Sequence, residues 1–367
     1  MKILIRADAS LEIGSGHIMR CLTLARALRL LGHQIHFICR EHAGHLGDFI
    51  IQSDFSLTLL PLHAEKTFSG SLKHSAWLAC NQEQDFADCL PTLSTIAPDW
   101  VIVDHYALSD TWENLCKQHF HSKLFIIDDL ADRKHCADIL LDQNISHSDH
   151  DYTPLVPKNC RLLIGTKYAL LRPEFAQMRN TSLQNKQTVS GSLKTILVNL
   201  GGVDKDNFTL KVLHALQNTL PNQAIEVIVV MGKTAPHTPS ILAYAQNSPY
   251  PCRVLVGVNN MAELMSQSDL AIGAAGSTSW ERCCLGLPTL QMVLADNQQE
   301  VAQHLQQHNA ARLIFSGSLK EDLQAFFTEI AHNPILLKQM SQQASLLCDG
   351  KGVEKVLGCM MNIFQAA

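Results

Sequence analysis

Short apolar runs alternate with amphipathic segments along the first part of this chain. Apolar spacings of three and four residues predict helices over 17–31 and 84–96, which Gly32 and Pro98 end. Strands that are apolar throughout and separated by helices are typical of a parallel sheet covered on both faces. The predicted strands are Ile3–Ile5, Gln34–Cys39, Leu57–Leu60, Trp100–Val103, Leu124–Ile127 and Ile139–Leu141. The first part is therefore predicted to be one α/β domain.

The second half repeats this pattern after a less regular, proline-containing section. The polar end of that section, residues 180–192, is expected to be a flexible linker. We expect two Rossmann-like domains, 1–155 and 156–342. The elements predicted in the second are strands over Thr195–Leu200, Ile225–Val230, Arg253–Val256 and Leu270–Ile272, and helices over Thr209–Leu220, Met261–Gln267 and Ser279–Leu285.

Composition narrows the class of protein. The 367 residues carry a net charge of −5, which gives no electrostatic basis for binding nucleic acid or an anionic membrane. No apolar run approaches the roughly 20 residues of a membrane span, and no signal peptide is apparent. The twelve cysteines form no Cys-x-x-Cys pair, so we expect a reduced, cytoplasmic protein. A strained disulfide between the adjacent Cys283 and Cys284 is the less favoured alternative.

The loop after the first predicted strand has the most informative pattern. It holds two glycines, Gly14 and Gly16, followed by His17 at the start of a helix. A strand–glycine loop–helix unit directs backbone N–H groups and a helix N-terminus toward an anionic ligand. The loop lacks the Lys-Ser/Thr end of a P-loop and the third glycine of a dinucleotide fingerprint. An imidazole here is a candidate general base, and Asp8 is a candidate to orient it.

Two segments of the second half have the composition of a phosphate site. Gly201-Gly202 follows a buried strand and allows close approach of the backbone to a phosphate. Gly276, Ser277 and Thr278 open a helix, and Glu281 lies in its first turn. A carboxylate repels a diphosphate, so Glu281 is expected to accept hydrogen bonds from sugar hydroxyls instead.

Further polar motifs bear on catalysis and on metal binding. Asp104-His105-Tyr106 follows a buried strand, where the phenol is placed to reach a substrate and Asp104 to cap the next turn. Residues 147–151 contain two histidines and two aspartates, but further ligands at metal-binding spacing are missing, so a polar loop is favoured over a metal site. No Gly-x-Ser-x-Gly nucleophile elbow follows any predicted strand.

These motifs belong to a longer series of segments that runs along nearly the whole chain. Those in the first half are Arg6-Ala-Asp-Ala-Ser, Ile13-Gly-Ser-Gly-His-Ile-Met-Arg-Cys21, Val103-Asp-His-Tyr106, Ile127-Asp-Asp-Leu-Ala-Asp-Arg133, Leu140-Leu-Asp-Gln-Asn144 and Tyr168-Ala-Leu-Leu-Arg-Pro-Glu-Phe175. Those in the second half are Asn199-Leu-Gly-Gly-Val-Asp204, Asn260-Met-Ala-Glu-Leu-Met265, Ala274-Ala-Gly-Ser-Thr-Ser-Trp-Glu281 and Asp296-Asn-Gln298. In this order the segments resemble those of one family, the UDP-sugar hydrolases of pseudaminic acid biosynthesis. The family's usual Ser/Thr-Phe-Gly-Gly is replaced here by Asn-Leu-Gly-Gly.

The resemblance implies a GT-B architecture, in which two Rossmann-like domains with parallel sheets face each other across a cleft. It implies that a C-terminal segment, 343–367, packs back on the first domain through its helix. It also implies a set of site residues. His17 would be catalytic; Asp8, Gly14, Ser15, Gly16, Arg20, Tyr106 and Asn297 would contact the sugar; and Gly201, Gly202, Met261, Gly276, Ser277, Thr278 and Glu281 would bind UDP.

The function implied is hydrolysis of the anomeric C–O bond of UDP-2,4-diacetamido-2,4,6-trideoxy-β-L-altropyranose, with inversion and without metal or cofactor. The product would feed nonulosonic acid synthesis for flagellin or surface glycans. The expected partner is the UDP-sugar, with no nucleic acid or membrane, and the protein would be a monomer or weak homo-oligomer. Two alternatives stay open: a UDP-sugar glycosyltransferase on the same fold, and a non-catalytic nucleotide-sugar binding protein. The exact sugar also stays open.

Overall fold

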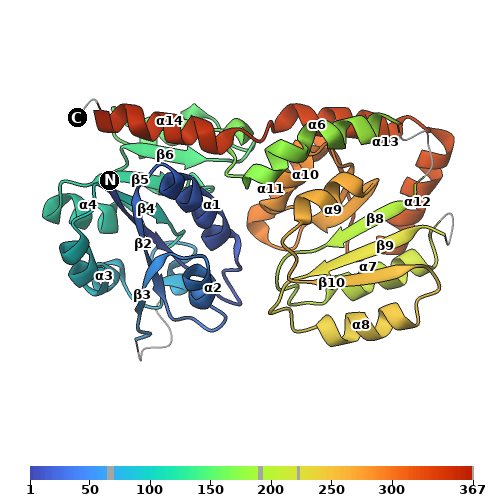
Figure 1. Ribbon diagram of the computed structural model, residues 1–367, viewed down its shortest axis with the longest axis horizontal. Helices are drawn as coiled ribbons and strands as arrows, with labels where there is room; N and C mark the ends of the chain where they lie inside the picture. Colours follow the sequence, from blue (N-terminus) through green and yellow to red (C-terminus); the bar gives the residue numbers. More distant parts are fainter. Residues whose placement is uncertain (64–69, 189–192, 221–223, 366–367) are drawn as a thin grey trace. The chain divides into compact units, whose positions relative to one another are not determined.

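The structure, a computed structural model, describes residues 1–63, 70–188, 193–220 and 224–365. It divides into two compact units, Met1–Leu170 with Gly352–Ala367, and Leu171–Lys351. Each unit is built around one parallel sheet (Figure 1). The predicted α/β fold with two parallel sheets is therefore confirmed.

The first unit has a seven-stranded sheet of order β3-β2-β1-β4-β5-β6-β7, in which every pair of neighbours is parallel. Its strands are β1 (Lys2–Ala7), β2 (Gln34–Arg40), β3 (Ser56–Leu60), β4 (Trp100–Asp104), β5 (Lys123–Ile127), β6 (Ile139–Asp142) and β7 (Arg161–Ile164). Its helices are α1 (Gly16–Leu30), α2 (Gly47–Gln52), α3 (Gln82–Ile96), α4 (Asp110–His119), α5 (Asp149–Tyr152) and α14 (Gly352–Gln365), with short 3-10 turns η1 (Ser75–Leu78), η2 (Thr153–Leu155) and η3 (Thr166–Tyr168).

Alternation along β1 explains why helices cover both faces of this sheet. Ile3 and Ile5 belong to one hydrophobic cluster, which includes the buried Val356 and Met360 of α14. Leu4, between them, belongs to a different cluster, formed with residues of α3 and α4. Successive side chains of a strand point to opposite faces, so both faces of the sheet are buried. The C-terminal helix α14 thus packs on the first unit, beside α1 (Figure 1).

The second unit has a six-stranded parallel sheet of order β10-β9-β8-β11-β12-β13. The strands are β8 (Thr195–Asn199), β9 (Glu226–Met231), β10 (Cys252–Val256), β11 (Leu270–Ala274), β12 (Thr289–Met292) and β13 (Ala311–Leu313). The helices are α6 (Pro173–Thr188), α7 (Phe208–Gln217), α8 (Thr238–Gln246), α9 (Met261–Gln267), α10 (Thr278–Cys284), α11 (Gln299–Gln307), α12 (Leu319–His332) and α13 (Leu336–Leu347), with η4 at Asp296–Gln298.

The structure differs from the sequence-based expectation at the junction of the two units. The first unit extends to Leu170 rather than residue 155, because β7 pairs with β6 and completes its sheet. The expected linker over 180–192 is wrong as far as residue 188, which belongs to α6; residues 189–192 lie outside the described residues. The Lys186 ammonium of α6 donates to the backbone carbonyls of Met265, Ser266 and Ser268, a long-range contact that the polar sequence does not reveal.

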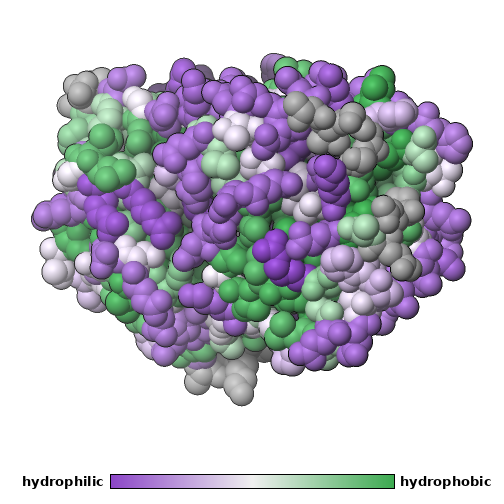
Figure 2. Space-filling model, turned by 45° about the vertical axis from the view of Figure 1, so that its right-hand side comes forward, coloured by the Kyte–Doolittle hydropathy of each residue, from purple (hydrophilic) through white to green (hydrophobic). Residues whose placement is uncertain are grey.

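The surface and the cysteines show no unusual feature among the described residues. Hydrophilic and hydrophobic side chains are interspersed on the face seen in Figure 2. Within the described parts of the chain, no helix is both long and apolar enough to cross a membrane. All twelve cysteines are free thiols, Cys283 and Cys284 included.

Candidate active site

Polar side chains gather at the carboxyl ends of the neighbouring strands β1, β4 and β5. Asp8 follows β1, Asp104 ends β4, and Asp128 and Asp129 follow β5. In a parallel sheet all strand carboxyl ends lie at one edge, which is where α/β proteins bind their ligands. The glycine loop and the start of α1 follow β1 at this same edge.

The glycine loop turns sharply between β1 and α1. The Ser10 hydroxyl accepts hydrogen bonds from the backbone N–H groups of Glu12 and Ile13, at 3.1 and 2.9 Å. Gly14 has a φ of +80°, in the left-handed region that favours glycine. Helix α1 then begins at Gly16, with Ser15 as its N-cap residue. As a result, His17 is placed on the first turn of α1, where only 7% of its surface is exposed.

Asp104 orients the imidazole of His17. His17 Nδ1 lies 2.6 Å from Asp104 Oδ1, and Arg20 donates to both oxygens of the same carboxylate, each at 2.7 Å. Burial raises the pKa of Asp104, but the Arg20 guanidinium and His17 lower it well below its usual range. An ionised carboxylate can only accept, so Nδ1 of His17 carries the proton. The other nitrogen, Nε2, is therefore left free to accept a proton.

A second aspartate joins Arg20 to Tyr106. Asp129 Oδ2 accepts a 2.5 Å hydrogen bond from Arg20 Nη1 and a 2.6 Å hydrogen bond from the Tyr106 hydroxyl. Burial and the negative charge of Asp129 raise the pKa of the Tyr106 phenol well above its usual range. The phenol is thus a neutral donor at physiological pH. The tyrosine ring lies edge-on to His17, with ring centroids 4.6 Å apart.

The expectation that Asp8 orients His17 is wrong. Asp8 Oδ1 accepts from Arg6 Nη1 at 2.6 Å and from the Arg40 backbone N–H at 2.7 Å. Its other oxygen lies 3.1 Å from His105 Nε2. These contacts join the ends of β1, β2 and β4, so Asp8 supports the edge of the sheet. Asp104, not Asp8, orients His17. The expectation that Asp104 caps a turn is also wrong, because both of its carboxylate oxygens contact His17 or Arg20 instead.

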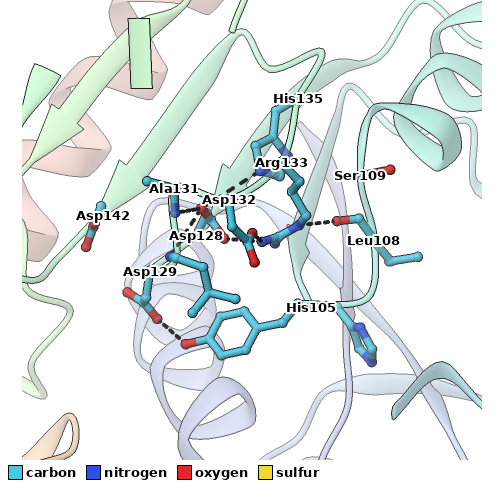
Figure 3. A network of polar contacts seen from close by, with 12 residues as sticks. His105, Leu108, Ser109, Asp128, Asp129, Ala131, Asp132, Arg133, His135 and Asp142 are labelled. Carbon is cyan, nitrogen blue, oxygen red and sulfur yellow. Dashed lines mark hydrogen bonds and ion pairs between the residues drawn. The ribbon is translucent and has the colours of Figure 1, made fainter. Parts of the chain in front are cut away.

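The loop after β5 separates two adjacent carboxylates, which Figure 3 shows aimed at different partners. Asp128 lies 2.7 Å from Arg133 Nη1 and accepts from the backbone N–H of Ala131. Burial raises the pKa of Asp128, but Arg133 lowers it, to a net value of about 2. Asp128 therefore fixes the loop in place, which leaves Asp129 free to hold Arg20 and Tyr106. Sequence reasoning placed both aspartates after a strand but did not identify Asp129 as a site residue.

The glycine turn after β8 packs tightly against the end of β9. Gly201 has a φ of +100°. A Cβ added at Gly232 would lie 1.9 Å from the backbone oxygen of Gly202. The turn that the sequence associates with a diphosphate can therefore lie this close only because the residue that follows β9 is a glycine.

The predicted helix start lies in the same unit, at the N-terminus of α10. Gly276 and Thr278 are half-buried and Ser277 is exposed, with no side-chain capping bond. The buried Arg282 donates to the backbone carbonyl of Ala274 and to the hydroxyl of Thr278. Glu281 projects from the first turn with 17% of its side chain exposed, 3.8 Å from Arg172 Nη2. Burial raises the pKa of Glu281 to about 7, although Arg172 lowers it.

The remaining predicted residues also lie in the second unit. Met261 is the first residue of α9, and Asn297 is exposed in η4.

Neither candidate for a metal site is convincing. The polar loop expected at 147–151 is wrong in part, because its residues from Asp149 onward belong to α5. His147 Nδ1 lies 2.7 Å from Asp142, and Ser148 caps α5 with Asp151. Among the residues that the structure describes, His63, Cys80 and Asp88 place ligand-type atoms within 4.8 Å of one another. However, the Arg40 guanidinium lies 2.9 Å from Asp88 Oδ2 and already supplies a positive charge there.

Comparison with sequence families and with single proteins finds relatives at low sequence identity. Residues 195–356 match the model of the glycosyltransferase family 28 C-terminal domain. A Campylobacter jejuni protein named UDP-2,4-diacetamido-2,4,6-trideoxy-beta-L-altropyranose hydrolase is 27% identical over 311 residues, covering 83% of this chain and 96% of that protein. An uncharacterized protein of Methanocaldococcus jannaschii is 26% identical over 307 residues, or 82% of this chain; the match spans only 57% of that longer protein.

Solved structures show the same architecture throughout the chain. MurG of Acinetobacter baumannii superposes with a TM-score of 0.67 at 15% identity, covering 98% of this chain and 99% of that one. The UDP-GlcNAc 2-epimerase of Neisseria meningitidis, solved with UDP-GlcNAc bound, gives a TM-score of 0.59 at 13% identity, with 99% and 100% covered. The chain therefore has an α/β fold of the GT-B type, and most of its second unit matches the glycosyltransferase family 28 C-terminal domain.

Proposed function

We propose that this protein hydrolyses UDP-2,4-diacetamido-2,4,6-trideoxy-β-L-altropyranose to UDP and the free sugar, a step of pseudaminic acid biosynthesis. The observation that carries the proposal is the buried His17–Asp104 pair at the carboxyl edge of the first sheet. The motifs shared with the hydrolase family and the 27% identity to the Campylobacter protein support the choice of substrate.

In this mechanism His17 Nε2 removes a proton from a water molecule. The water oxygen attacks the anomeric carbon, the bond from that carbon to the diphosphate oxygen breaks, and UDP leaves with the electron pair from the opposite face. Asp104 stabilises the imidazolium that forms, since its carboxylate already accepts from Nδ1. General-base assistance of this kind contributes about 10²- to 10⁴-fold. The sugar product is inverted at the anomeric carbon.

The second unit binds UDP in this proposal. The match of residues 195–356 to a glycosyltransferase C-terminal domain supports this assignment. Glu281 accepts from the ribose hydroxyls, Gly201 and Gly202 and the start of α10 hold the diphosphate, and Met261 lines the uracil site. Asn297 and Tyr106 contact the sugar. Backbone N–H groups can stabilise the charge of the leaving diphosphate, so the reaction needs no metal.

A UDP-sugar glycosyltransferase is the second candidate. The match of residues 195–356 to the glycosyltransferase family 28 C-terminal domain favours it. It would use the same base to deprotonate an acceptor hydroxyl instead of water. A non-catalytic binding protein would have no use for an oriented histidine.

The test is incubation of the purified protein with this UDP-sugar in ¹⁸O-labelled water, with EDTA and without an acceptor. We expect release of UDP, followed by phosphorus NMR, and one ¹⁸O atom in the free sugar, detected by mass spectrometry. Label in the nucleotide would move the attack to phosphorus and overturn the role of His17. Tight binding without turnover would overturn hydrolysis and favour the transferase or the binding protein.

A further inference from the structure

A short turn brings two aromatic side chains next to His17. The turn η1 (Ser75–Leu78) is closed by a 2.9 Å hydrogen bond from the Trp77 backbone N–H to the His74 carbonyl. The Ser75 hydroxyl donates to the Leu72 carbonyl and accepts from the Leu72 N–H, at 2.8 and 3.0 Å. Ala79 ends the turn with a φ of +60°. These contacts hold the backbone of the turn from which His74 and Trp77 project.

The rings of Trp77 and His74 pack beside the ring of Tyr106, next to the candidate base His17. Trp77 stacks on Tyr106, with centroids 5.8 Å apart and an angle of 25° between the planes. It is also edge-on to His17, at 6.3 Å and 79°. The His74 ring lies 4.4 Å from that of Trp77 and 5.5 Å from that of Tyr106. Four rings thus form one cluster, which we call the aromatic wall: His17, His74, Trp77 and Tyr106.

Unmet hydrogen-bonding capacity marks the wall as a place for a ligand. His74 Nε2 is buried and finds no hydrogen-bond partner among the residues that the structure describes, a state that is unfavourable for a polar atom. Burial lowers the pKa of His74, and the charge of Lys73 lowers it further. A neutral imidazole nitrogen supplies one hydrogen bond but no positive charge to pair with an anion. An acetamido group or a hydroxyl therefore suits it better than a phosphate does.

We propose that Trp77 and His74 form the sugar-recognition face of the active site: Trp77 packs against apolar C–H or methyl groups of the sugar, and His74 Nε2 hydrogen-bonds to one of its uncharged polar substituents. This inference rests on the function proposed above.

The chemistry of the substrate matches such a face. Aromatic rings have an electron-rich face that attracts the weakly positive hydrogens of C–H groups. A trideoxy sugar with two acetamido groups is rich in C–H and methyl surface and carries neutral amides. Ligand sites typically combine apolar and aromatic walls with a few placed polar groups. The proposed mechanism puts His17 beside the anomeric carbon, and the ring of Trp77 is centred 6.3 Å from the ring of His17. Trp77 therefore lies close to the sugar in this proposal.

The experiment compares the variants W77A, W77F and H74A with the native protein. As a matched control, A76S changes an exposed residue of the same turn. For each protein, kcat and KM are measured with the diacetamido UDP-sugar, and the inhibition constant is measured for UDP, which lacks the sugar. We expect W77A and H74A to raise KM tenfold or more with kcat within threefold. W77F and A76S should stay within threefold of native, and UDP inhibition should be unchanged in all.

Unchanged KM values in W77A and H74A would overturn the inference while leaving the proposed hydrolysis intact. Weakened UDP inhibition in W77A would also overturn it, because the ring would then hold the nucleotide or support the fold. Should the native protein release no UDP, the proposed function fails. The inference is then tested by calorimetry, where a UDP-sugar that binds native protein and W77A equally well would overturn it.

Discussion

Asp104 holds His17 and Arg20 with a single buried carboxylate. Oδ1 lies 2.6 Å from His17 Nδ1 and accepts from Arg20 Nη2 at 2.7 Å, while Oδ2 accepts from Arg20 Nε at 2.7 Å. The arginine and the histidine are three residues apart on α1, and the aspartate ends β4. This arrangement fixes both the tautomer and the direction of the candidate base, and the first prediction follows from it.

The D104N variant is expected to lose activity by about 10²- to 10⁴-fold in kcat, because an amide can present its N–H₂ to Nδ1 and favour the wrong tautomer. H17A should lose a similar amount, and the double variant should be little worse than either alone, since the two residues act as a unit. Steady-state kinetics of UDP release measure this, with D48N, on an exposed residue of α2, as the control. Additive losses would mean that Asp104 does not act through His17.

Removing the cation at position 20 is expected to destabilise the first unit. In R20M, Asp104 and Asp129 stay buried without their guanidinium partner, and breaking a buried pair in this way costs about 3–5 kcal/mol. The R29M variant removes an exposed arginine of the same helix, whose guanidinium donates to the carbonyls of Ser53 and Asp54, so it should cost only about 0.5–1.5 kcal/mol. Denaturant unfolding measures the difference. Equal effects of the two substitutions would contradict the network described for Asp104 and Asp129.

Glu281 is predicted to make stability depend on pH. Burial raises its pKa from 4.5 to about 7, so the folded protein binds its proton more tightly than the unfolded chain does. The resulting contribution is complete below about pH 4.5 and is lost as the pH rises through 7. E281Q should therefore be more stable than native at pH 8, by at most about 3 kcal/mol, with the difference shrinking toward pH 4.5.

Thermal unfolding at pH 5 and pH 8 tests this shift. The same variant should bind UDP at least tenfold more weakly if Glu281 accepts from the ribose, so stability and binding should change in opposite directions. A native pH dependence that persists in E281Q would show that another group is responsible.

The close approach of two glycines predicts that position 232 does not tolerate alanine. The added Cβ would lie 1.9 Å from the Gly202 carbonyl oxygen, so the turn after β8 must move. G232A should unfold at a lower temperature and bind UDP at least tenfold more weakly. G358A is the matched control: nothing lies within 4 Å of its new Cβ, and alanine in place of glycine within α14 should stabilise by about 0.5–1 kcal/mol. A stable G232A with native UDP affinity would contradict the role of the turn.

Local sequence patterns were enough to predict an α/β fold with two parallel sheets. Apolar runs such as Ile3–Ile5 and Trp100–Val103 marked the strands, and Gly32 and Pro98 marked helix ends, because periodicity and backbone restrictions are local properties. The placing of His17 after a glycine loop was visible for the same reason. The pattern failed at α6, where polar residues are held in a helix by distant carbonyls such as those bound by Lys186.

Which charged side chains pair could be seen only in the folded protein. Asp8, Asp104 and Asp129 all follow or end strands, and nothing in the sequence ranks them as partners of His17. The order of strands in the sheet sets that choice, since it places β1 beside β4 and β4 beside β5. His74 and Trp77 belong to no motif, and the fold alone brings their rings to the base. Contacts between residues far apart in the chain depend on how the elements pack, and local sequence does not encode that directly.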